Sequence, residues 1–152
     1  MATSYSGLTV LVAGGTSDSH TWNLVFLQIM LQEAGYQVVN IGPCVPEQLL
    51  VDRCRDVTPD LVVIGSVNGH GYQDGELAIL ALRAEPDLAA LPAVIGGKLG
   101  VEGKQDEVLR ARLLDAGFDA VFDDGDLDSF LRFVADLRVG SSADEPAGAV
   151  SA

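Results

Sequence analysis

Near its start the chain reads Gly7-Leu-Thr-Val-Leu-Val-Ala13 and then Gly14-Gly-Thr-Ser-Asp-Ser-His20. The first segment is a short apolar run, which is typical of a strand buried on both faces, as in a parallel sheet covered by helices on both sides. The second segment is small or polar up to the histidine and predicts a loop. A helical pattern then occupies residues 21–34 and ends at Gly35, where a C-cap glycine belongs.

The same alternation of strand and helix continues along the chain. We predict strands at residues 7–13, 37–41, 60–65, 92–95 and 119–122, and helices at 21–34, 46–57, 74–84, 107–116 and 126–139. Parallel strands joined through helices need right-handed crossovers, so five such units predict an α/β fold with a doubly wound, five-stranded parallel sheet. We expect the flavodoxin-like strand order 2-1-3-4-5. Residues 1–139 form the predicted domain, and residues 140–152, poor in large apolar side chains, are predicted to be a disordered tail.

Composition excludes several classes of function. The chain has 152 residues, and 22 acidic against 9 basic side chains give a net charge of −13. Such a charge repels nucleic acid and anionic membranes, and no apolar run is long enough to span a bilayer. Cys44 and Cys54 are too few for a disulfide framework, so we expect free thiols and a soluble, cytoplasmic protein.

A ligand crevice is expected at the carboxyl ends of the first and third strands, where the strand order reverses. The loops at residues 14–20 and 66–71 face it and hold both histidines. Asp18 and His20 are two residues apart and can point to one side, so the carboxylate can orient the imidazole as in a metal-ligating histidine. The alternative is a surface Asp-x-His pair without a partner. Gly14-Gly15 lacks the third glycine and the lysine of nucleotide-binding loops.

The same residues disfavour a zinc centre made only of protein ligands. Asp18, His20 and His70 would have to converge from two loops, with no cysteine in reach. One histidine with one carboxylate instead suits a metal that arrives already chelated.

Asp18-Ser-His20, with Asn23 three residues later, resembles the Asp-x-His-x-x-Gly motif of cobalamin-binding domains. The resemblance covers about residues 7–137 and includes Gly96-Gly97. It is closest to the small, cobalamin-binding subunits of glutamate mutase (methylaspartate mutase), which also share a strand end like Val38-Val-Asn-Ile-Gly42.

The resemblance implies adenosylcobalamin as cofactor, bound with its dimethylbenzimidazole displaced from cobalt. His20 would be the lower axial ligand of cobalt, oriented by Asp18, and the nucleotide tail would run between the sheet and its helices. The matching cofactor-binding positions are Ser17, Asp18, Ser19, His20, Thr21, Gly65, Ser66, Val67, Gly96, Gly97, Lys98, Leu99, Gly100, Val101 and Gly103. A glycine pair lets a heterocycle approach the backbone, although without the resemblance it is equally an ordinary turn.

Three positions depart from the family pattern. Asn23 stands where the motif ends in glycine, and Gly65 replaces the serine of a Ser-x-Leu motif, with Ser66 beside it as a candidate replacement. His70 occupies a position where the family commonly has glutamine. It is either an exposed loop histidine or a contact for the corrin side chains or a partner.

The chain shows no convergent arginines that would grip a dicarboxylate substrate, so no catalytic residue is expected in it. The resemblance implies an isomerase in which a larger, barrel-shaped subunit binds glutamate. Homolysis of the cobalt–carbon bond would start a radical rearrangement to 3-methylaspartate, with the radical chemistry supplied by the cofactor.

Three alternatives stay open. The first is the cobalamin subunit of a mutase for a related branched acid. The second is a corrinoid carrier for methyl transfer, although such carriers usually have a helical bundle before this domain, and six residues precede the first predicted strand. The third is a flavodoxin-like regulatory module that binds no cobalamin.

Overall fold

The computed structural model describes residues 7–67, 70–97, 106–123 and 127–137. Its five strands form one parallel sheet in the order β2-β1-β3-β4-β5, which confirms the predicted fold and strand order. The strands are β1 (Thr9–Gly14), β2 (Gln37–Gly42), β3 (Leu61–Ser66), β4 (Ala93–Gly97) and β5 (Ala120–Asp123). The helices are α1 (Trp22–Glu33), α2 (Glu47–Val57), α3 (Gly71–Arg83) and α4 (Asp106–Ala116), and residues 127–137 are also helical.

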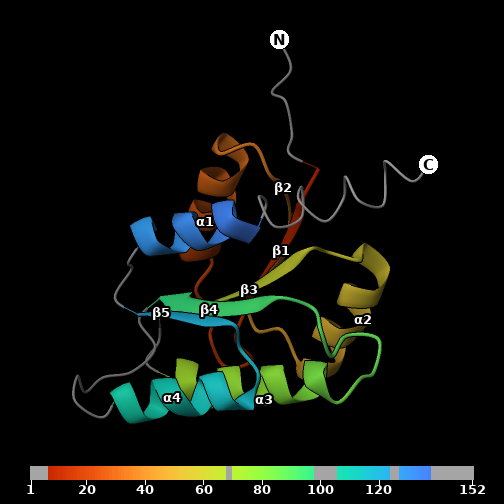
Figure 1. Cartoon of the computed structure of the whole chain (residues 1–152), viewed down its shortest axis with the longest axis vertical. Helices are drawn as coiled ribbons and strands as arrows, with labels where there is room; N and C mark the ends of the chain where they lie inside the picture. The colour runs from red at the N-terminus through yellow and green to blue at the C-terminus, as the bar shows by residue number, and fades with distance from the viewer. Residues whose placement is uncertain (1–6, 68–69, 98–105, 124–126, 138–152) are drawn as a thin grey trace.

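The sheet lies between two helical layers (Figure 1). Helices α2, α3 and α4 cover one face, and α1 with helix 127–137 covers the other. Each face of the sheet has its own hydrophobic core, and the side chains of successive strand residues pack into the two cores in turn. Leu11 and Val62 pack toward α2 and α3, whereas Val12 and Val63 pack toward α1. This alternation explains the continuous apolar runs, because each central strand is buried on both sides.

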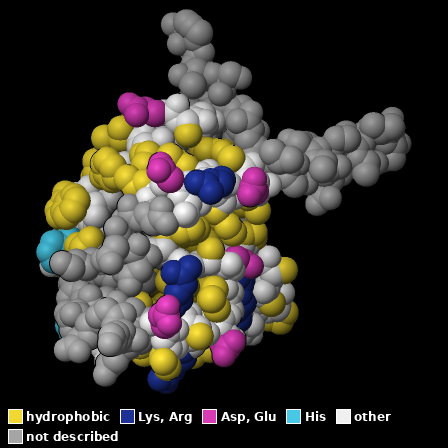
Figure 2. All heavy atoms as spheres, turned by 60° about the vertical axis from the view of Figure 1, so that its left-hand side comes forward, with side chains coloured by type: hydrophobic (Ala, Val, Ile, Leu, Met, Phe, Trp, Pro, Cys, Tyr) yellow, Lys and Arg dark blue, Asp and Glu magenta, His cyan; other side chains and the backbone are white. Residues whose placement is uncertain are grey.

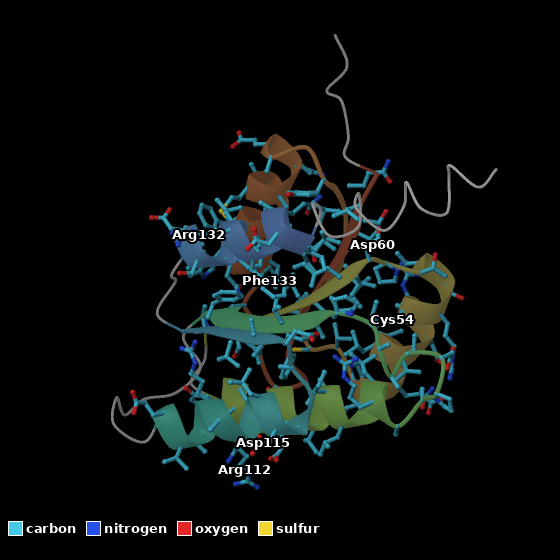
Figure 3. All side chains as sticks on the ribbon, in the orientation of Figure 1. Cys54, Asp60, Arg112, Asp115, Arg132 and Phe133 are labelled. Atoms are coloured by element: carbon cyan, nitrogen blue, oxygen red, sulfur yellow. The ribbon has the colours of Figure 1, made fainter. Side chains whose placement is uncertain are left out.

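Helix 127–137 is held on the sheet by aromatic side chains. Phe122 of β5 makes edge-on contacts with Phe130 and Phe133, with ring centroids 5.6 and 6.0 Å apart. Phe133 lies toward the sheet and Arg132 away from it (Figure 3). In the opposite helical layer, Arg112 and Asp115 lie on the side of α4 that faces away from the sheet. The helix packs on the sheet through one apolar face, with Phe130 and Val134 buried.

Two predicted boundaries were wrong. Helix α3 begins at Gly71 rather than at residue 74, because the carbonyl of His70 already accepts a helical hydrogen bond from the Asp74 N–H. Strand β4 continues through Gly96 and Gly97, which pair with Gly65 and Ser66 of β3. The glycine pair is thus the end of a strand and not a turn that follows it.

The two cysteines differ in accessibility. Cys54 is 1% exposed and lies in the core between α2 and the sheet (Figure 3), where burial raises the pKa of its thiol to about 11. Cys44 is exposed. Since the thiolate is the reactive form, we expect one fast equivalent in a thiol titration of the native protein at neutral pH, and a second only after unfolding. Cys44→Ser should remove the fast equivalent, and two fast equivalents in the wild type would contradict the packing of Cys54.

Within the described residues, no helix combines the length and apolar character that a bilayer crossing requires. The predicted tail at residues 140–152 lies outside the described part of the chain.

Candidate functional site

The loop between β1 and α1 is tied to three neighbouring elements. Asp74 of α3 accepts hydrogen bonds from the backbone N–H and the hydroxyl of Ser17, at 2.9 and 2.6 Å. The Thr16 hydroxyl donates to Glu47 of α2 at 2.7 Å. The backbone N–H of Cys44, after β2, donates to the carbonyl of Asp18 at 3.0 Å. The loop therefore has a defined conformation before any ligand binds.

Asp74 was not predicted as part of the site. It is buried in the first turn of α3, and a Cβ on Gly15 would lie 2.9 Å from its Cβ and its Oδ2. Gly15 thus serves to let Asp74 reach the loop. The available signal was an acidic residue on the buried face of a helix, between Tyr72 and Ala78, and it was missed because the helix was started too late.

Asp18 is the centre of the site. Its side chain is 1% exposed, and each carboxylate oxygen accepts two hydrogen bonds. Oδ1 accepts from the His20 backbone N–H at 3.0 Å and from His20 Nδ1 at 2.7 Å. Oδ2 accepts from the Val67 N–H at 2.7 Å and from the Ser66 hydroxyl at 3.2 Å. One carboxylate thus joins the loop after β1 to the end of β3, at the predicted reversal point of the sheet.

These contacts fix the charge on Asp18. Burial by itself raises the pKa of the carboxyl, but the donors from the backbone of Val67 and His20 and from the side chains of His20 and Ser66 outweigh burial and lower its pKa below the ordinary value. Asp18 is therefore ionised at neutral pH and acts only as an acceptor.

The ionised carboxylate determines which ring nitrogen of His20 is available. Because Asp18 can only accept, Nδ1 of His20 carries the proton, and in the neutral ring Nε2 has a free lone pair. The His20 side chain is 47% exposed, at the mouth of the crevice. Within the described residues, no three side chains from His, Cys, Asp and Glu gather as a metal cage. The arrangement can supply one oriented imidazole to a metal.

Beside this pair is an apolar cleft of about 190 Å³ between the sheet, α1 and helix 127–137. Its lining residues are Trp22, Asn23, Phe26, Leu27, Val63, Gly65, Val67, Val94, Gly96, Gly97, Phe122, Leu127 and Phe130. Figure 2 shows hydrophobic side chains gathered over the upper part of the molecule, where these two helices lie. Its lining begins at Trp22, two residues after His20, and its volume suits a flat, apolar group.

The floor of the cleft is open because the strands end in glycine. Gly97 has φ +113°, and a Cβ there would lie 2.1 Å from the carbonyl oxygen of Ser66. A Cβ on Gly96 would lie 3.1 Å from the carbonyl oxygen of Phe122. No side chain fits at Gly97, so the fold requires glycine at this position whether or not a ligand binds.

The structure brings most of the predicted cofactor-binding residues to this crevice. Gly65, Val67, Gly96 and Gly97 line the cleft, and Ser17, Ser19 and Thr21 are exposed beside the Asp18–His20 pair. Lys98, Leu99, Gly100, Val101 and Gly103 lie outside the described residues. His70 is exposed at the residue before α3.

Ser66 does not take the position proposed for it next to Gly65. Its side chain is fully buried and its hydroxyl donates to Asp18, while the residues on either side of it line the cleft. Neighbouring strand residues point to opposite faces, so the Ser66 hydroxyl is directed away from the cleft.

Known proteins resemble this chain in sequence and in fold. The profile of the B12 binding domain family matches residues 8–128. A glutamate mutase sigma subunit from Haloarcula marismortui is 31% identical over 81% of this chain and 80% of its own length. One from Treponema denticola is 34% identical over 72% of this chain and 78% of its own length.

Among solved structures, a cobalamin-binding protein from Desulfitobacterium hafniense has a TM-score of 0.62 and 25% identity. The match covers 77% of this chain and 53% of that protein, so the chain spans about half of its length. A receiver domain of a histidine kinase from Syntrophus aciditrophicus has a TM-score of 0.65 at 21% identity over 88% of this chain and 92% of that one, a likeness of fold alone. With the family profile matched over most of its length, and with sigma subunits as its relatives, the chain belongs to the B12-binding domain family and, within it, to the glutamate mutase sigma subunits.

Proposed function

We propose that this chain is the cobalamin-binding subunit of glutamate mutase, an isomerase that interconverts glutamate and 3-methylaspartate, and that His20 is the lower axial ligand of cobalt in adenosylcobalamin. One observation carries the assignment of the site: Asp18 holds Nδ1 of His20 at 2.7 Å, which leaves Nε2 available two residues before Trp22, where the lining of the glycine-floored cleft begins. The relatives from Haloarcula marismortui and Treponema denticola are glutamate mutase sigma subunits, which supports the reaction.

The residues present fit a corrinoid bound with its own base displaced. His20 offers one imidazole, as expected for a metal whose equatorial ligands come from a macrocycle. The cleft beside it, lined by Gly65, Gly96 and Gly97, offers an apolar slot for the displaced heterocycle and its linker. When bound, adenosylcobalamin supplies the radical through its cobalt–carbon bond.

The residues of this chain would hold the cofactor and orient the histidine that contacts its metal. His20 fixes the position of the metal, Asp18 fixes the tautomer and direction of His20, and the loop tethers from Asp74 and Glu47 hold both in place. The cleft excludes water from the tail because nearly all of its lining is apolar.

Asp18 is a positioning residue, and its replacement tests that role. Asp18→Asn keeps the size of the side chain but removes the charge, and we expect the dissociation constant for cobalamin to rise about 10- to 100-fold, as for other partners of metal-bound histidines. Titration followed by the visible spectrum measures it. Asp52→Asn on the exposed face of α2 is the matched control and should leave the constant unchanged. Equal binding by wild type and Asp18→Asn would contradict the role.

A second protein is needed for the substrate. Apart from His20, no basic side chain is present among the described residues that line the cleft or form the loop at residues 15–21, so nothing there can grip a dicarboxylate. We infer that a larger, barrel-shaped catalytic subunit binds glutamate and covers the other side of the corrin. Lys98 to Gly103, after β4, complete the proposed cofactor-binding set.

The reaction is tested by reconstitution. The pure chain, a candidate catalytic subunit, adenosylcobalamin and glutamate should together give 3-methylaspartate, and omission of either protein should give none. Turnover of a homologous branched acid but not of glutamate would reassign the substrate. Methyl transfer from methylcobalamin without any mutase activity would favour a corrinoid carrier instead.

A further inference from the structure

The cleft holds one polar side chain that its surroundings do not explain. Asn23, in the first turn of α1, is 8% exposed, and its Oδ1 is fully buried without a hydrogen-bond partner among the described residues. The other side chains that line the cleft are apolar. Buried side-chain oxygens of folded proteins nearly always have a partner, so an unpaired amide in an apolar cleft points to a partner that arrives with a ligand.

The carboxamide lies directly against the glycine floor. Asn23 Nδ2 lies 3.3 Å from the position that a Cβ on Gly65 would take, and Cδ2 of Leu24 lies 3.1 Å from the same point. A larger side chain at Gly65 would therefore compete with Asn23 for one volume. Residues 23 and 65 together leave room for one polar side chain, and in this chain that side chain is Asn23 on α1.

We propose that the carboxamide of Asn23 hydrogen-bonds the heterocyclic base of the cofactor's displaced nucleotide tail and fixes the orientation of that base in the cleft. This inference rests on the proposed function. A carboxamide carries one acceptor oxygen and two N–H donors, and the edge of a nitrogen heterocycle offers complementary groups. In a pocket that is otherwise apolar, one such polar group sets the orientation of a flat ligand.

The sequence pattern of the family has its polar group on the other wall. The motif has glycine at the position of Asn23 and serine at the position of Gly65, whereas this chain has the reverse arrangement of small and polar residues. Ser66 cannot provide the missing group, because its hydroxyl is bonded to Asp18 on the opposite face of the strand. In this chain the polar side chain of the pair therefore lies on α1 and the small residue on β3.

The test compares two corrinoids that differ only in the tail. Cobalamin and cobinamide, the latter without the nucleotide, are titrated against wild type and Asn23→Leu, with the visible spectrum as readout. We expect the dissociation constant for cobalamin to rise about tenfold in the variant, since the base loses its hydrogen bonds in a dry cleft. The constant for cobinamide should stay within about twofold, because it places no base beside residue 23.

The stability of the ligand-free protein distinguishes the proposed role from a merely structural one. If Asn23 serves the ligand, Asn23→Leu removes a buried oxygen without a partner, and the melting temperature of the ligand-free protein should stay constant or rise. A lower melting temperature together with equal weakening of both corrinoids would overturn the proposal, and so would unchanged binding of cobalamin.

Exchange of the two positions provides the matched control. Asn23→Gly alone should weaken cobalamin about as much as Asn23→Leu, and the double variant Asn23→Gly with Gly65→Ser should recover binding to within about threefold of wild type. If wild type ligates neither corrinoid through His20, the proposed function fails and the inference fails with it. If both are ligated and the Asn23 variants do not discriminate between them, the inference alone is overturned.

Discussion

Replacing His20 with alanine is expected to abolish the imidazole-ligated, base-off spectrum of bound cobalamin and to raise its dissociation constant at least about 100-fold. The loss should exceed that for Asp18→Asn, because the substitution removes the metal ligand itself rather than the group that orients it. Within the described residues, no three side chains from His, Cys, Asp and Glu gather as an alternative metal cage. Visible spectroscopy of the pure protein with one equivalent of cobalamin measures the change.

The chain's other histidine provides the control. His70 is exposed before α3 and is not among the described residues that line the cleft, so His70→Ala should keep the wild-type spectrum. Added imidazole should partly restore the ligated spectrum to His20→Ala, because the slot left by the ring stays open. An identical spectrum for wild type and His20→Ala would exclude the axial-ligand role.

The second large effect is expected at Gly97, on stability. Gly97→Ala should lower the free energy of unfolding by more than about 3 kcal/mol, because two penalties combine at this residue. Its φ of +113° disfavours any L-residue, and the new Cβ would lie 2.1 Å from the carbonyl oxygen of Ser66. That oxygen belongs to the backbone of β3, so it cannot move aside without disturbing the sheet. Urea unfolding followed by circular dichroism measures the loss.

Gly42 separates the two penalties. It also ends a strand with a positive φ, +94°, but no atom lies within 4 Å of a Cβ built there. Gly42→Ala should therefore cost only about 1 to 2 kcal/mol, the strain of the backbone alone. Equal losses at Gly42 and Gly97 would show that the clash with Ser66 relaxes freely and that the end of β4 is less rigid than described.

Features that depend on local pattern could be predicted from the sequence. The apolar runs predicted the positions of the strands, and the expected reversal of strand order predicted which two loops form the site. The spacing of Asp18 and His20 gave their hydrogen bond. The residues that decide the strands and the Asp18–His20 pair are neighbours in the chain, so pattern and geometry carry nearly the same information there. The two loops followed instead from the expected strand order.

Features that depend on contacts across the fold could not be predicted in the same way. Asp74 is distant in sequence from Ser17, and nothing local shows that its carboxylate reaches the loop. The start of α3 was misplaced because glycines weaken a helical pattern. Gly75 nevertheless belongs in this helix, because a Cβ there would lie 2.4 Å from Cδ1 of Ile95. Likewise, Ser66 was predicted in the loop after the strand but is the last residue of β3, and its contact with the distant Asp18 shows that its hydroxyl faces away from the cleft.

The tethered loop has a thermodynamic consequence. The hydrogen bonds that the loop donates to Asp74 and Glu47 and accepts from the Cys44 N–H order the segment around His20 during folding. Its conformational entropy is therefore lost then and not on encounter with a ligand. If cobalamin binds at His20 as proposed, it would dock onto a preorganised surface, and its association rate should not be limited by the ordering of this loop. Transfer of the Asp-x-His segment alone to another scaffold would leave these tethers behind, and the transferred loop would lack this order.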